Sequence, residues 1–141
     1  MSDLTVIVNL TLAFFLGGIV GWFRELEGKT AGMRTHILVC VGSALFMIVS
    51  YKMMIIGSYG DPSRIAAGVV TGIGFLGAGC IIQSGNGVKG VTTAASIWIT
   101  AAIGVAVGAS FYVEAITVIA LTIIALELLR QVEKRVIKTK E

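Results

Sequence analysis

Five apolar stretches of about 20 residues each follow one another along this chain of 141 residues. A helix needs about 20 residues to cross the hydrocarbon core of a bilayer. Lipid offers the backbone no hydrogen-bond partners, so each stretch is predicted to be helical. The sequence therefore predicts an all-α fold, an integral membrane bundle of five transmembrane helices in one domain that covers residues 1–141. The expected spans are Leu4–Phe23, Ile37–Ile56, Ile65–Gln83, Thr93–Phe111 and Tyr112–Leu129.

The composition agrees with a membrane protein. Hydrophobic residues make up 56% of the chain and charged residues only 13%, about half the charged fraction of a soluble domain. The first stretch is too long for a signal peptide and no basic segment precedes it, so we expect it to remain in the mature protein. The basic residues flank apolar stretches instead of interleaving with aromatic ones, which argues against nucleic-acid binding. Cys40 and Cys80 lie within apolar stretches and are expected to be buried thiols.

The lysines and arginines are distributed unevenly between the two sides of the predicted bundle. With the N-terminus outside, the outer side holds two of them, Lys52 and Arg64. The inner side holds nine, which are Arg24, Lys29, Arg34, Lys89, Arg130, Lys134, Arg135, Lys138 and Lys140. The positive-inside rule therefore predicts an N-terminus outside and a C-terminus inside.

Glycine is frequent in the most apolar part of the chain, as in VVTGIGFLGAG, Val69 to Gly79. On a helical wheel the bulky residues of the third span form one stripe, predicted to face lipid, and the small residues lie opposite. Small residues let membrane helices approach closely, so we expect this span to pack tightly against at least two others. A second interpretation is a broken helix that lines an ion or substrate site. The predicted packing glycines are Gly17, Gly21, Gly68, Gly72, Gly74, Gly77, Gly79, Gly104 and Gly108.

The first inner loop, RELEGKTAGMRTH, is the densest charge cluster before the C-terminal tail. One interpretation is a loop whose basic residues anchor it at the membrane surface. The other is a docking site for an anion, a lipid headgroup or a protein partner, in which Arg24, Lys29 and Arg34 contact phosphate. Glu25 and Glu27 are expected either to pair with these cations or to meet a metal.

Single polar residues near the span ends have mainly structural interpretations. His36 is expected to be a hydrogen-bonded boundary residue, with a metal or pH role as the alternative. Asp61, followed by Pro62, is predicted to cap the third helix. As the one carboxylate of its loop, Asp61 is also a weak candidate for a divalent cation, which normally gathers several oxygen ligands. Asn86-Gly87 predicts a turn, and Thr92 is predicted to cap the fourth helix.

The pattern of reactive residues does not suggest an enzyme. No nucleophile and base are paired by motif, and no Walker-type loop is present. No carboxylate lies in the middle of a span, which argues against a proton-driven carrier. We expect no cofactor other than, at most, Mg²⁺.

Three stretches read together, GWFRELEGKTAGMRTHILVCVGSALF, DPSRIAAGVVTGIGFLGAG and VKGVTTAASIWITAAIGVAVG, resemble the MgtC/SapB family of bacterial inner-membrane proteins. The resemblance implies a multi-pass inner-membrane protein linked to adaptation to low magnesium, acid or intracellular growth. It further implies modulation of other membrane proteins, the proton-translocating ATP synthase among them. Many relatives add a soluble C-terminal domain, which is not expected here. The matching motif residues are Arg24, Glu25, Lys29, Arg34, Thr35, Asp61, Arg64, Gly72, Gly74, Gly77, Gly79, Thr92 and Thr93.

Two functional hypotheses follow. The first is a small regulator that acts by helix–helix contact with other inner-membrane proteins, in contact with membrane lipids and with homodimerisation expected. The second is a channel or transporter for a divalent cation, with Asp61 at the outer mouth and Glu25 and Glu27 at the inner one. The basic inner loops, through Arg24, Lys29, Arg34 and Lys89, are in addition expected to bind lipid headgroups. The residues predicted to bind a partner or lipid are Arg24, Glu25, Lys29, Arg34, Thr35, His36, Thr92 and Thr93.

Overall fold

The computed structural model describes residues 1–57, 61–84 and 87–131. Five helices confirm the predicted all-α membrane bundle. They are α1 (Asp3–Leu26), α2 (Met33–Gly57), α3 (Ser63–Gly79), α4 (Val91–Gly108) and α5 (Tyr112–Ile123), which continues as the π-helical turn η1 (Ile124–Leu128). Four helical segments are long and apolar enough to cross a membrane, whereas α3 is shorter, with 17 residues.

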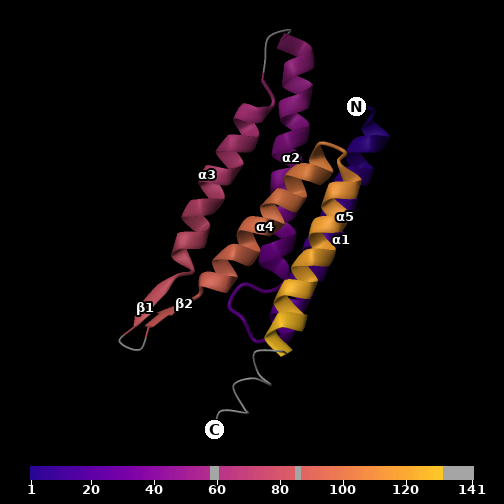
Figure 1. The fold of residues 1–141 in the computed structure, drawn as a ribbon. Coiled ribbons are helices and arrows are strands. Elements are labelled where there is room, and N and C mark those ends of the chain that lie inside the picture. The colour runs from indigo at the N-terminus through magenta and orange to yellow at the C-terminus, as the bar shows by residue number, and fades with distance from the viewer. Residues whose placement is uncertain (58–60, 85–86, 132–141) are drawn as a thin grey trace.

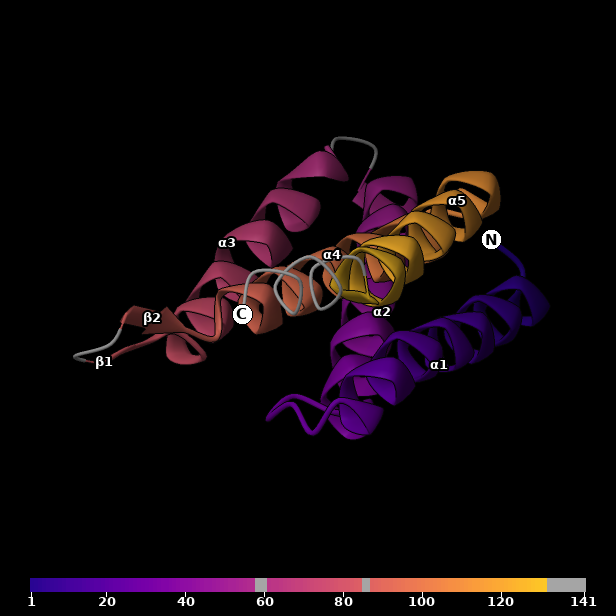
Figure 2. The same cartoon turned by 60° about the horizontal axis from the view of Figure 1, so that its bottom comes forward.

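The helices are arranged around α2 and α4 (Figures 1 and 2), with α1 on one side of this pair and α3 on the other. The main core lies between α1, α2, α4 and α5, and includes Val20, Cys40, Ile103 and Ile119. A smaller core joins α3 to α4 and the α1–α2 loop. The N-terminus and the last turn of α5 lie at opposite ends of the bundle. The end with the α1–α2 loop and the end of α5 is called the charged end below. Which side of the membrane it faces stays a prediction.

Glycines bring α1 and α4 into backbone contact with α2. A Cβ atom added at Gly17 would lie 2.7 Å from the carbonyl oxygen of His36, and one at Gly108 would lie 2.5 Å from that of Ala44. Atoms added at Gly21 and Gly104 would collide with the backbone of Met33 and of Cys40. The small faces of α1 and α4 therefore both serve the contact with α2, by the close approach expected in membranes.

The orientation of α3 differs from the prediction. Gly68, Gly72, Gly74 and Gly79 have no atom within 4 Å of an added Cβ, and only Gly77 approaches another helix, 3.5 Å from Ala94. Of the bulky stripe that was predicted to face lipid, Ile73 is buried, whereas Leu76 is 53% exposed. The predicted packing of α3 through its glycines against two helices is therefore wrong within the chain.

The surface of α4 explains this orientation of α3. Its small face is already occupied by α2, so α3 meets a different face of α4. There Ile73, which is 8% exposed, packs with Ile97 and Ala101. Large side chains are needed to fill this wider space. The helix also runs without interruption from Ser63 to Gly79, unlike the broken helix that was the alternative.

A short hairpin follows α3 at the charged end. The strands β1 (Ile82–Ser84) and β2 (Gly87–Lys89) pair antiparallel, so the third helix ends four residues before the predicted Gln83. The predicted cap Thr92 is wrong, because Gly90 is the N-cap of α4. Gly90 has a φ of 89°, which disfavours any residue with a side chain. A Cβ atom added there would also collide with the carbonyl oxygen of Cys80. Of the predicted turn, Asn86 lies outside the described residues.

A polar clamp fastens α5 to α1 at the end opposite the charged one. Asn9 is fully buried; its Nδ2 donates to Ser110 Oγ at 3.2 Å, and its Oδ1 accepts from the Tyr112 hydroxyl at 2.6 Å. Ser110 ends α4 with a φ of 65° in a Schellman-type turn closed by Phe111 N–H and Ala106 O at 2.8 Å. The turn thus presents two polar partners to the one buried amide of α1.

Replacing Tyr112 with phenylalanine is expected to lower the free energy of unfolding by about 2 kcal/mol, because it leaves the buried Asn9 carbonyl without its donor. Unfolding in mixed detergent micelles measures the loss. Tyr51, which is half-buried, is the matched control: Tyr51→Phe should change stability by less than about 0.5 kcal/mol, the usual range away from such contacts. Equal effects of the two substitutions would contradict the clamp.

Candidate functional site

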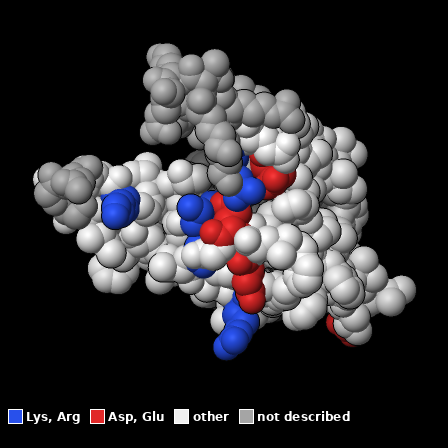
Figure 3. Space-filling model, turned by 90° about the horizontal axis from the view of Figure 1, so that it is seen from below, with Lys and Arg blue, Asp and Glu red and all other residues white. Residues whose placement is uncertain are grey.

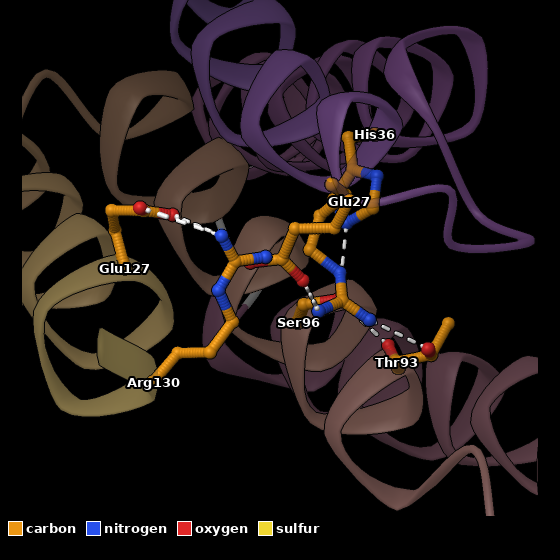
Figure 4. A network of polar contacts seen from close by, with 7 residues as sticks. Glu27, His36, Thr93, Ser96, Glu127 and Arg130 are labelled. Carbon is orange, nitrogen blue, oxygen red and sulfur yellow. Dashed lines mark hydrogen bonds and ion pairs between the residues drawn. The ribbon is translucent and has the colours of Figure 1, made fainter. Parts of the chain in front are cut away.

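Seven polar side chains meet at the charged end and are called the polar cluster below (Figure 4). They come from α1 and its C-cap, α2, α4 and the end of α5. Seen from this end, most Lys, Arg, Asp and Glu side chains lie in one band across the middle of the surface, and a further basic patch lies apart from this band (Figure 3). The members are Arg24, Glu27, His36, Thr93, Ser96, Glu127 and Arg130.

Arg24 is the most buried charge of the cluster, with 1% of its surface exposed. Its Nη1 lies 3.2 Å from Glu27 Oε2, and its Nη2 donates to Thr93 Oγ1 at 2.6 Å. It occupies the last turn of α1, where a cation also interacts favourably with the helix dipole. Glu27 is the C-cap of α1 and lies three residues after Arg24, a spacing at which side chains of one helix face meet; Gly28, with a φ of 64°, then ends the helix.

Glu27 lies between two arginines. Its side chain is 4% exposed, and its Oε1 is 3.0 Å from Arg130 Nη1 as an ion pair. Arg130 in turn approaches Glu127 Oε2, on the π-helical turn, at 3.4 Å. Two cations and two anions therefore balance, and the pairs join α1 to the end of α5. Within the described residues, Nε of both arginines has no hydrogen-bond partner.

His36 is fully buried and held at both ring nitrogens. Its Nδ1 donates to the carbonyl oxygen of Gly32 at 2.8 Å, and its Nε2 lies 3.2 Å from Ser96 Oγ. The Ser96 hydroxyl has one hydrogen, so it donates either to His36 Nε2 or to the carbonyl oxygen of Thr93, which lies 2.8 Å away. This is the environment of a buried, hydrogen-bonded boundary residue.

The other predicted loop residues do not join the cluster. Glu25 caps α2, because its Oε2 accepts from the Met33 N–H at 2.9 Å. Lys29, Arg34 and Thr92 are exposed, and Thr35 is half-buried. Of the cations predicted to contact lipid headgroups, Arg24 is already engaged inside the protein. Lys29, Arg34 and Lys89 are exposed and make no ion pair in residues 1–57, 61–84 and 87–131.

Asp61 lies far from the cluster, at the start of α3. Its Oδ1 accepts from the Ser63 N–H at 2.9 Å, but the N-cap of α3 is Pro62, so the predicted cap at Asp61 is wrong by one residue. Hydrogen bonds from Ser63, and to a smaller extent the charge of Arg64, hold the pKa of Asp61 below its usual value. Among the described residues, no three His, Cys, Asp or Glu side chains are grouped closely enough to hold a metal ion.

Several polar contacts were not predicted. Glu127 and Arg130 are three residues apart at the end of a helix, a spacing typical of ion pairs, but the contact of Arg130 with Glu27 spans most of the chain. Ser96 and Asn9 are polar residues inside apolar stretches. Such residues in membrane helices usually face the bundle interior and hydrogen-bond across it, which is the signal that would have found them.

Comparison with known proteins identifies one matching family and several relatives. The model of the MgtC family matches residues 10–135. The chain is 46% identical over 134 residues to the Escherichia coli (strain K12) protein "Putative magnesium transporter YhiD", across 92% of this chain and 62% of the relative. It is 46% identical over 97 residues to Protein MgtC of Brucella abortus, across 69% and 40% of the two chains.

Protein MgtC of Salmonella typhimurium is 40% identical over 130 residues, which cover 92% of this chain and 54% of the relative. The chain thus spans between 40% and 62% of the length of these three relatives. No solved structure matches the chain.

Proposed function

Because the chain belongs to the MgtC family, we propose that it is a magnesium-related protein of the bacterial inner membrane that regulates other membrane proteins by contact within the bilayer. The ATP synthase is one candidate partner. The names of the relatives, MgtC and putative magnesium transporter, support the link to magnesium. The multi-pass helical bundle supports a function inside the membrane.

One observation favours the regulator hypothesis over the transporter hypothesis. The buried carboxylate nearest the charged end, Glu27, is neutralised by Arg24 and Arg130, which lie within 3.2 Å and 3.0 Å of its oxygens. A divalent cation prefers several free oxygen ligands, and two arginines beside the carboxylate repel it. The cluster therefore ties helices together and leaves the lipid-facing surfaces of the bundle for contact with partners.

A transporter is the second candidate, because the Escherichia coli relative is named as a putative magnesium transporter. In that case Asp61 would attract the cation at one end and the polar cluster would be its gate at the other. The ion pairs of Glu27 would then have to open during each transport cycle.

A transport assay in proteoliposomes distinguishes the regulator from the transporter. With this protein alone, Mg²⁺ entry reported by an enclosed indicator is expected to equal that into empty vesicles at several pH values, since the buried Glu27 is already paired with two arginines. Vesicles with a magnesium ionophore show that the indicator responds. Entry above the empty vesicles that falls in Glu27→Gln would contradict the regulator and support the transporter.

The regulator also requires a partner. A photo-reactive amino acid at the lipid-facing positions Phe15 or Trp22 of α1, which are 60% and 52% exposed, should link the chain to another membrane protein in native membranes. The same group at Ile56, near the opposite end and 83% exposed, is the control for random collision. Equal yields at all three positions would speak against a specific contact through α1.

A further inference from the structure

The side of α3 that faces away from α4 is uncovered. Its residues lie three or four apart and so occupy one face of the helix. Gly68 and Gly72 leave the backbone open there, and Phe75, 83% exposed, is the most exposed aromatic residue on it. This surface, called the free face of α3 below, consists of Arg64, Gly68, Thr71, Gly72, Phe75 and Gly79.

An apolar groove runs beside the free face, between α2 and α3, with a volume of about 810 Å³. Gly42 of α2 and Gly68 and Gly72 of α3 line it together with larger residues. Of these, Leu38 is 72% exposed and Phe46 is 58% exposed. A row of glycines flanked by large apolar side chains is a shape into which the ridge of another membrane helix can pack.

We propose that the occupant of this groove is a second copy of the chain, with the two α3 helices side by side. Copies of one sequence insert in the same direction, so a two-fold axis between them stands perpendicular to the membrane. Residues at equal depth then meet: glycines face glycines, which allows close backbone approach, and Phe75 of each copy reaches the groove of the other.

The charges at the start of α3 favour a second copy over another occupant. Asp61 and Arg64 are exposed, opposite in sign and three residues apart, and neither makes an ion pair within the described ranges. Asp61 and Arg64 lie on neighbouring strips of the helix surface, so a two-fold axis that passes between these strips brings Asp61 of each copy to within about one helical turn of Arg64 of the other. One chain then supplies both halves of two reciprocal pairs. A lipid acyl chain has no such complement, and a different protein would have to provide it anew. The proposal goes beyond regulation or transport and depends on neither.

Cysteine cross-linking in membranes tests the contact. Cys80→Ala leaves Cys40, which is fully buried, and Thr71→Cys then places one exposed thiol on the free face. Oxidation should give at least tenfold more cross-linked dimer than the matched control Val70→Cys. Val70 is the sequence neighbour, 51% exposed, but faces the α4 side. Equal yields, or products that contain only other proteins, would overturn the proposal.

A charge exchange tests the reciprocity. Asp61→Arg alone and Arg64→Asp alone each place like charges opposite one another, and each should lower the cross-linking of the Thr71→Cys chain at least threefold. Coexpression of the two variants restores two attractive pairs in the mixed dimer and should recover the yield. Absence of recovery would show that these residues do not face one another.

A bulky residue provides the third measurement. Gly72→Leu meets no atom within 4 Å at its Cβ in the single chain, so the thermal unfolding of the chain at high dilution should not change. Its association, followed by energy transfer between labelled copies, should weaken at least tenfold. Unchanged association would overturn the proposal.

Discussion

Glu27→Gln is expected to lower the free energy of unfolding by about 3 kcal/mol. Removal of one partner from a buried ion pair typically costs about 3–5 kcal/mol, because the remaining charge stays buried without compensation. Here two arginines lose their anion, and Arg24 is 1% exposed. The estimate is at the lower end because Arg130 is 33% exposed and is partly screened by solvent.

Two further substitutions make this prediction specific. Arg130→Gln should cost less than Glu27→Gln, because Glu27 keeps Arg24 and the lost cation is the more exposed one. Glu114→Gln changes an exposed carboxylate in the first turn of α5 and should cost less than about 1 kcal/mol. Reversible unfolding in mixed micelles gives all three values. If Glu27→Gln costs no more than Glu114→Gln, the cluster does not hold the helices together.

Gly104→Ala is expected to have an effect of similar size, about 3 kcal/mol, by overpacking. The added methyl group would collide with the carbonyl oxygen of Cys40 and lie 2.9 Å from Ser43 Cβ. The backbone of α2 cannot move aside as a flexible side chain would, so α2 and α4 must separate along their contact. Mixed-micelle unfolding and the yield of folded protein should both fall.

Gly72→Ala is the matched control. It is the same chemical change in a helix of the same bundle, but its Cβ meets nothing within 4 Å. Alanine is also the better helix former, so the stability of the single chain should stay the same or rise. Equal losses at positions 72 and 104 would mean that the glycines act through helix propensity and not through close packing.

The lengths of the apolar stretches were sufficient to predict five helices, because the thickness of the bilayer and the need for internal hydrogen bonds fix both length and type. Local chemistry also predicted that Asp61 lies at the start of the third helix, although the N-cap itself is Pro62. The rotation of α3 was predicted the wrong way round. Its two faces are both apolar, so hydrophobicity does not distinguish lipid from protein, and the choice depends on which face of α4 remains available.

Of the contacts in the polar cluster, only the one between residues close together in the sequence was predicted. Arg24 and Glu27 are three residues apart at one helix end, and pairing with the loop's cations was one of the two expectations for Glu27, the other being contact with a metal. The contact between Glu27 and Arg130 joins opposite ends of the sequence, and a single sequence carries no information on that distance. Thr93 and His36 were chosen as binding residues, but their partners Arg24 and Ser96 lie inside the protein.

The two polar contacts that join α5 to α1 have a mechanical consequence. Tyr112 joins the start of the helix to Asn9, and Arg130 joins its end to Glu27, so both tethers lead to the first helix. A force applied to the chain beyond residue 131 would act first on the ion pair between Arg130 and Glu27, and only then on the apolar contact between α5 and α4. This force would be transmitted through Glu27 to Gly28 and the loop that follows it. The end of α5 and the α1–α2 loop, which are about a hundred residues apart in sequence, would thus be coupled through continuous contacts.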